Sequence, residues 1–228
     1  MHVGFVSFRI IMLKFQHPST FLLSGATSSG KTRFTFKLLQ NVDVMFQPNQ
    51  PVRILYCYSE WQSLFESHVD HIRFHRGLPD ESDKIFDSKL PSISVLDDLT
   101  QETNEFVSRM FTQLSHHRSL SVLYLSQNLF NNQNKFHRTI SLNSHYVILF
   151  KYPRDTSQIG HMARQVFGNQ WRHAVDAFRD ATRQAYGYLV FDLHPQTDEE
   201  FRLRTQVFPG EVEIIYRPTI KAGKTNKT

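Results

Sequence analysis

Residues 19–33 read Ser19-Thr20-Phe21-Leu22-Leu23-Ser24-Gly25-Ala26-Thr27-Ser28-Ser29-Gly30-Lys31-Thr32-Arg33. An apolar run, a loop of small residues and the first turn of a helix follow one another here. From Gly25 to Thr32 the stretch matches G-x-x-x-x-G-K-[ST] at every fixed position, the pattern of a loop whose backbone N–H groups surround phosphate. A chance Gly/Ser turn before a helix is the competing explanation, and the strand–loop–helix context argues against it.

These residues predict a site for a nucleoside triphosphate with Mg²⁺. Small side chains let the backbone curl around the phosphates at Gly25, Ala26, Thr27, Ser28, Ser29 and Gly30. Lys31 supplies positive charge to the β- and γ-phosphates, and the Thr32 hydroxyl is a ligand for the metal. The helix expected from Gly30 towards Gln40 points the positive end of its dipole at the same place.

Polar residues directly follow two further apolar strands. Ile93-Ser94-Val95-Leu96 leads into Asp97 and Asp98, about 65 residues after the loop, as Mg²⁺-dependent hydrolysis requires. Asp97 would hold the metal and Asp98 would orient or deprotonate the attacking water; capping of the helix expected at 101–117 is the competing role. Strand 119–126 ends in Gln127, a candidate sensor of the γ-phosphate, for which loop capping is an equally good explanation.

The rest of the chain alternates strands with helices. Strands are expected at 52–58, 72–75, 145–150, 188–193 and 201–208, and helices at 59–68, 155–166 and 170–181. Residues 129–142 form a polar, Asn-rich stretch without an assigned element. The alternation predicts an α/β fold with a mostly parallel sheet and helices on both faces. A strand inserted between the two nucleotide-binding strands is expected, as in RecA-like (ASCE) P-loop NTPases.

Composition sets the domain organisation. With 228 residues, 40% of them hydrophobic, the chain can bury one substantial core. We expect one domain over 1–216, with an N-terminal strand or packing arm at 1–17, and a basic, disordered tail at 217–228. The lone Cys57 excludes an internal disulfide and suits a reducing compartment. Surface positions are expected for His68, His71 and His75, which lack cysteine partners and metal-ligand spacing.

Two observations concern location and charge. The apolar run 3–13 contains Arg9 and lacks the features of a signal peptide, and no stretch approaches the roughly 18 apolar residues of a membrane span. We therefore expect an intracellular protein that is neither secreted nor embedded in a membrane.

Residues 118–228 hold 15 Lys and Arg against nine Asp and Glu, which suits a polyanion-binding face and equally a solvated basic surface.

The chain resembles the FtsK/HerA-superfamily genome-packaging ATPases of Polinton/Maverick elements and adintovirus-like viruses, relatives of the poxvirus packaging ATPase. The resemblance covers about residues 15–216, and the part from Ser115 to Asp155 is the most specific. It rests on Gly-Ala-Thr-Ser-Ser-Gly-Lys-Thr, Val-Leu-Asp-Asp-Leu, Ser-His-His-Arg, Leu-Ser-Gln-Asn-Leu-Phe, Arg-Thr-Ile-Ser-Leu-Asn and Lys-Tyr-Pro-Arg-Asp.

The resemblance implies a ring of subunits that couples ATP hydrolysis with Mg²⁺ to threading double-stranded DNA into a capsid. By position, Lys31 and Thr32 bind phosphates and Mg²⁺, Asp97 serves the metal, Asp98 is the catalytic carboxylate and Gln127 is the sensor. Many superfamily members have Glu at the second acidic position, so the shorter Asp98 departs from the pattern.

The resemblance also implies an arginine supplied by a neighbouring subunit, with Arg118 and then Arg138 as candidates; each also suits simple solvation or a local ion pair. DNA contacts would be phosphate-directed and sequence-independent, with 131–138 and the basic tail as candidate pore segments. A capsid or portal partner and a nuclear, cytoplasmic or virion-associated location are expected.

Two other functions remain open. A small-molecule kinase of the nucleoside type would use the same loop, with Arg172, Arg179 and Arg183 imitating a basic lid. A GTPase would need an Asn/Thr-Lys-x-Asp motif, which the sequence lacks. A nucleotide-binding protein without turnover is the last alternative, although the loop, the acidic pair and Gln127 are all present.

Overall fold

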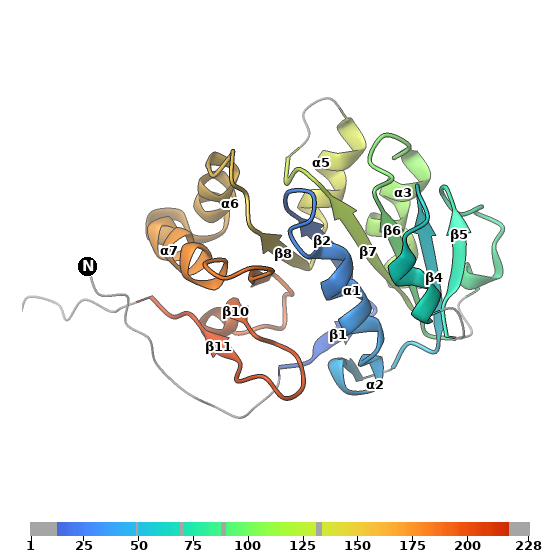
Figure 1. Cartoon of the computed structure of the whole chain (residues 1–228), viewed down its shortest axis with the longest axis horizontal. Coiled ribbons are helices and arrows are strands. Elements are labelled where there is room, and N and C mark those ends of the chain that lie inside the picture. Colours follow the sequence, from blue (N-terminus) through green and yellow to red (C-terminus); the bar gives the residue numbers. More distant parts are fainter. Residues whose placement is uncertain (1–12, 49, 69–70, 88–89, 131–133, 219–228) are drawn as a thin grey trace, which may run out of the picture.

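The computed structural model describes residues 13–48, 50–68, 71–87, 90–130 and 134–218. Within them a nine-stranded sheet has the order β11-β10-β9-β8-β2-β7-β6-β4-β5, and a second sheet pairs β1 with β3 (Figure 1). The strands are β1 Phe15–His17, β2 Thr20–Ser24, β3 Phe46–Pro48, β4 Arg53–Tyr58, β5 Arg73–Arg76, β6 Ser92–Asp97, β7 Leu120–Ser126, β8 Tyr146–Phe150, β9 Tyr188–Asp192, β10 Leu203–Thr205 and β11 Ile214–Ile215. The helices are α1 Lys31–Leu39, α2 Val42–Met45, α3 Glu105–Arg109, a π-helical turn Met110–Leu114, α4 Ser115–His117, α5 Lys135–Leu142, α6 Ser157–Phe167 and α7 Trp171–Ala181, with 3₁₀ turns at Ser63–His68, Lys84–Phe86, Gly168–Gln170 and Glu199–Phe201.

The large sheet is mostly parallel, which confirms the predicted α/β class. Strands β8, β2, β7, β6, β4 and β5 run in one direction. Strands β9 and β10 pair in the antiparallel direction, with Leu203 opposite Phe191. Strands β2, β6, β7 and β8 are buried at every position, as expected for parallel strands covered on both faces.

Strand β7 lies between β2 and β6. Ser24 at the end of β2 is opposite Ser126, and Asp97 at the end of β6 is opposite Leu125. Because parallel strands end at the same edge of a sheet, the loop after β2, the acidic pair after β6 and Gln127 after β7 meet at one edge.

Two apolar clusters cover the two faces of the sheet. Successive residues of a strand belong to different clusters: Phe21 and Leu23 of β2 belong to one cluster, and Leu22 belongs to the other. Helices α1 and α2 pack on the first face, whereas α3, α5, α6 and α7 supply residues to the second. Burial of a large apolar side chain stabilises the fold by about 1.5–3 kcal/mol, so these residues fix how the helices lie on the sheet.

Several segments differ from expectation. The helix predicted at 59–68 is a 3₁₀ turn at Ser63–His68, and the strand predicted at 201–208 covers only Leu203–Thr205. The helix predicted at 101–117 begins at Glu105, because the Asn104 side chain accepts a hydrogen bond from Val107 N and caps the helix there. The polar stretch 129–142 contains α5, which Asn134 caps in the same way and which buries Ile140. Of the arm predicted at 1–17, residues 1–12 lie outside the described residues, and Phe15–His17 form β1. Residues 219–228 of the tail predicted at 217–228 and candidate pore residues 131–133 also lie outside them.

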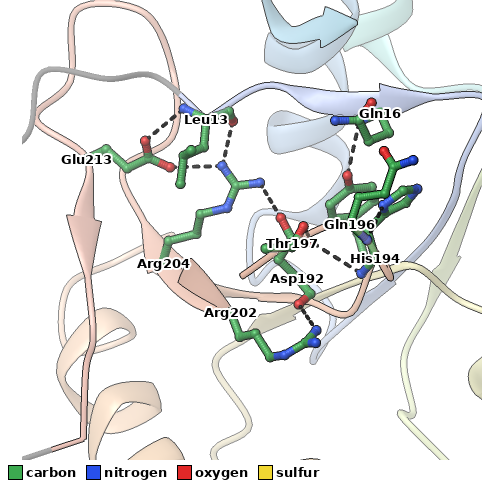
Figure 2. Close-up of polar contacts among 10 residues, drawn as sticks. Leu13, Gln16, Asp192, His194, Gln196, Thr197, Arg202, Arg204 and Glu213 are labelled. Carbon is green, nitrogen blue, oxygen red and sulfur yellow. Dashed lines mark hydrogen bonds and ion pairs between the residues drawn. The ribbon is translucent and has the colours of Figure 1, made fainter. Parts of the chain in front are cut away.

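A buried ionic cluster ties the beginning of the described chain to its last strands (Figure 2). The Arg204 guanidinium is fully buried and lies 2.9 Å from Asp192 Oδ2 and 2.9 Å from Glu213 Oε1. It also donates to the carbonyl of Leu13, whose N–H donates to Glu213 at 3.1 Å. A buried charge requires partners, so Arg204 holds residue 13 beside β9 and β10.

Candidate active site

The loop between β2 and α1 needs both glycines of its motif. A Cβ at Gly25 would lie 2.6 Å from Cβ of Phe150, closer than real side chains approach. Gly30 precedes α1 with φ 112°, a left-handed conformation that favours glycine. The backbone of this loop is therefore determined by residue types that the sequence pattern already contains.

Lys31 folds back over the loop. Its Nζ donates to the carbonyl oxygens of Gly25 at 2.7 Å and Ala26 at 3.1 Å. Burial lowers the pKa of Lys31, while the charges of Asp97 and Asp98 oppose that change. The Lys31 ammonium therefore lies against the loop, and two nearby carboxylates favour its protonated form.

Asp97 is held from two sides at the end of β6. The Tyr56 hydroxyl donates to Asp97 Oδ2 at 2.6 Å, and Thr32 Oγ1 donates to the same atom at 3.2 Å. Asp97 is 5% exposed, and burial raises its pKa, while the hydrogen bonds from Tyr56 and Thr32 lower it. Burial also raises the pKa of Tyr56 well above its ordinary value, so its hydroxyl stays a donor.

Thr32 and Asp97, the two predicted metal ligands, are therefore neighbours. A hydroxyl and a carboxylate fit Mg²⁺, which takes one or two protein oxygens and completes its shell with water and phosphate. In the described part of the chain, including the exposed His71 and His75, no group of three or more His, Cys, Asp or Glu could hold a metal by itself.

Asp98 lies beside Gln127 at the same edge. Gln127 Nε2 donates to Asp98 Oδ1 at 3.3 Å, and both residues are exposed. Asp98 has φ 58°, a left-handed conformation that costs a non-glycine residue about 1 kcal/mol or more. The chain turns at this point, so two consecutive carboxylates have different surroundings, one buried and one in solvent.

These groups line one open cleft of about 520 Å³, a volume typical of small-ligand sites. Its walls come from the loop, the ends of β6 and β7, and two segments distant in sequence. The lining residues are Thr27, Ser28, Ser29, Gly30, Lys31, Thr32, Arg33, Gln62, Asp97, Asp98, Leu125, Ser126, Gln127 and Tyr186.

Sequence reasoning missed four residues of this site: Tyr56, Arg33, Gln62 and Tyr186. The sequence predicts only that Tyr56 belongs to a strand at 52–58, and the packing of β4 beside β6 is what places its hydroxyl on Asp97. In the register of β4 and β6, Tyr56 is opposite Val95, and Tyr58 is opposite Asp97. Tyr56 therefore reaches Asp97 diagonally, and no pattern within β4 marks it as the donor. No local pattern marks Gln62 or Tyr186.

The candidate arginines lie elsewhere. Arg118 precedes β7 at the amino edge of the parallel strands, opposite the cleft, and donates to the carbonyl of Phe86 at 3.0 Å. Arg138 is exposed on α5. Arg172, Arg179 and Arg183 lie on α7 or just after it, and none of these five arginines is among the cleft-lining residues.

No protein-family model matches this chain, and no curated protein shows significant similarity to it. Among the described residues, the helices are too short or too polar for any to cross a bilayer.

Proposed function

We propose that this chain is a RecA-like P-loop ATPase that hydrolyses Mg·ATP and uses the energy to move double-stranded DNA, as the resemblance to genome-packaging motors implies. One observation carries the ATPase part. Thr32 of the phosphate-type loop and Asp97 of a neighbouring strand lie in hydrogen-bond contact, next to Lys31 and Asp98. This is the set of groups that hydrolysis of a nucleoside triphosphate requires.

The sheet order supports the RecA-like assignment. The strand that leads into the loop, β2, is separated from the acidic strand β6 by one strand, β7. This arrangement matches the strand that is expected between the two nucleotide-binding strands of such an ATPase. Loop, acidic pair and Gln127 then share one edge, where open α/β sheets bind their ligands.

Each residue has a task in the proposed reaction. Loop N–H groups and Lys31 would hold the phosphates, and Thr32 and Asp97 would hold Mg²⁺, which neutralises phosphate charge when bound. Asp98 is the exposed carboxylate and would take the proton of the attacking water. Gln127 would hold the Asp98 side chain through its Nε2 donor and link it to β7.

The DNA part of the proposal is supported by charge. Basic residues exceed acidic ones after position 117, and several are exposed on α6 and α7, including Arg164, Arg172 and Arg179. Phosphate-directed contacts of this kind are independent of sequence, as a motor needs. A homo-oligomeric ring, an arginine from a neighbouring subunit, and a capsid or portal partner belong to the same proposal.

The test is ATP hydrolysis with and without long double-stranded DNA, at low and moderate salt. DNA should raise turnover, and salt should remove the increase because counterion release weakens phosphate contacts. Lys31→Ala should abolish turnover, whereas Lys37→Ala should not, since Lys37 lies on the same helix outside the cleft and pairs with Glu211. Turnover that survives Lys31→Ala would overturn the ATPase proposal, and turnover indifferent to DNA would overturn the motor.

A further inference from the structure

Tyr186 is an exposed aromatic residue at the phosphate-type loop. It precedes β9, lines the cleft and is 55% exposed. A Cβ placed on Gly30 would lie 3.2 Å from Cβ and Cδ1 of Tyr186, so the side chain lies against the start of α1. An aromatic ring left open to water beside a ligand cleft offers an apolar surface that a ligand can cover.

The backbone holds Tyr186 in this place. Tyr186 has φ 61°, a left-handed backbone conformation that is unusual for an aromatic residue. The next residue must be glycine, because a Cβ on Gly187 would lie 2.3 Å from the carbonyl oxygen of Ala181 at the end of α7. Strain of this kind persists where surrounding structure enforces it, and it clusters at ligand sites.

Arg33 adds a second planar group. Its guanidinium carbon lies 5.2 Å from the centre of the Tyr186 ring, and Arg33 follows Thr32 in the first turn of α1. The pair therefore adjoins the loop that would hold the phosphates, within one continuous cleft. Aromatic rings and arginine planes are the surfaces on which proteins stack nucleobases.

We propose that Tyr186 and Arg33 form a stacking site for the base of the nucleotide whose phosphates occupy the loop. The inference rests on the proposed nucleotide site and specifies its ligand as a nucleoside di- or triphosphate rather than a bare polyphosphate. Stacking uses the face of a base, so the site should accept purines and pyrimidines.

The experiment compares Mg·ATP with Mg·tripolyphosphate, which has the phosphates without the base, by titration calorimetry on the full chain. Tyr186→Ala should weaken Mg·ATP binding by roughly 5- to 100-fold and leave Mg·tripolyphosphate binding unchanged. Tyr186→Phe should bind Mg·ATP like the wild type. Tyr186→Leu, which keeps an apolar side chain over Gly30, should lose most of the affinity that alanine loses.

Two results would overturn the stacking site. One is Mg·ATP affinity unchanged in Tyr186→Ala; the other is an equal loss for Mg·ATP and Mg·tripolyphosphate, which would mean that Tyr186 only shapes the loop. Failure of the nucleotide site itself looks different. Lys31→Ala would then bind both ligands as tightly as the wild type, and that outcome would remove the proposed function along with this inference.

Discussion

Tyr56→Phe removes one hydroxyl from the fold and tests how Asp97 is held. The ring should keep its stacked contact with Phe36, whose centroid lies 5.1 Å away, so packing should hardly change. The 2.6 Å hydrogen bond to Asp97 is lost, and a hydrogen bond to a charged group contributes about 1.5–3 kcal/mol. We expect the free energy of unfolding to fall by about 2 kcal/mol at neutral pH.

The loss should depend on pH. Burial raises the pKa of Asp97 above its ordinary value of 3.8, so the folded state holds this proton more tightly than the unfolded state does. The stability contributed by Asp97 is therefore largest at low pH and decreases as the pH rises from 3.8 through the raised pKa. Tyr56→Phe removes an interaction that favours the ionised carboxylate, so the pKa of Asp97 rises further and the destabilisation grows across this window.

The assay is urea unfolding followed by tryptophan fluorescence, at neutral pH and at the lowest pH where the fold persists. The difference between Tyr56→Phe and wild type should shrink towards the acid end. Tyr58→Phe is the matched control, because it removes a hydroxyl from the same strand that is not among the hydrogen-bond donors to Asp97. An equal loss at both pH values would refute the electrostatic account and assign the effect to packing.

Three further changes test other parts of the structure. Gly25→Ala places a Cβ 2.6 Å from Cβ of Phe150 and should cost about 1–3 kcal/mol; an unchanged melting temperature would contradict that contact. Arg204→Met leaves two buried carboxylates without their cation and should cost about 3–5 kcal/mol in urea unfolding at neutral pH, far more than Arg179→Met at an exposed pair. Asp98→Asn should lower ATP turnover by about 10²–10⁴-fold with nucleotide affinity retained; near-normal turnover would exclude Asp98 as the base.

Some features could be predicted because their residues are adjacent in the chain. Strand, small-residue loop and helix start follow one another in residues 19–33, and the structure has them in that order as β2, the loop and α1. The mostly parallel sheet was predictable from the alternation of apolar strands with helices, and the parallel pairing of β8, β2, β7, β6, β4 and β5 confirms it. Helix α5 was not predicted, because few of its eight residues are buried and the apolar pattern is therefore weak. Its capping residue, Asn134, is one of several asparagines in a polar stretch.

The local sequence was sufficient to predict the small-residue loop and the two carboxylates at a strand end, because each of these features depends only on residues that are adjacent in the chain. Which distant side chains contact the loop and the carboxylates could be seen only in the folded structure. Tyr56 reaches Asp97 across 41 positions, and Tyr186 reaches Gly30 from the turn before β9, because strand order and backbone turns bring them together. The fold also gives two adjacent aspartates different environments. Asp97 is buried, which raises its pKa, whereas Asp98 is exposed and accepts a hydrogen bond from Gln127. Burial and long-range contact depend on the path of the whole chain, and no local pattern contains that path.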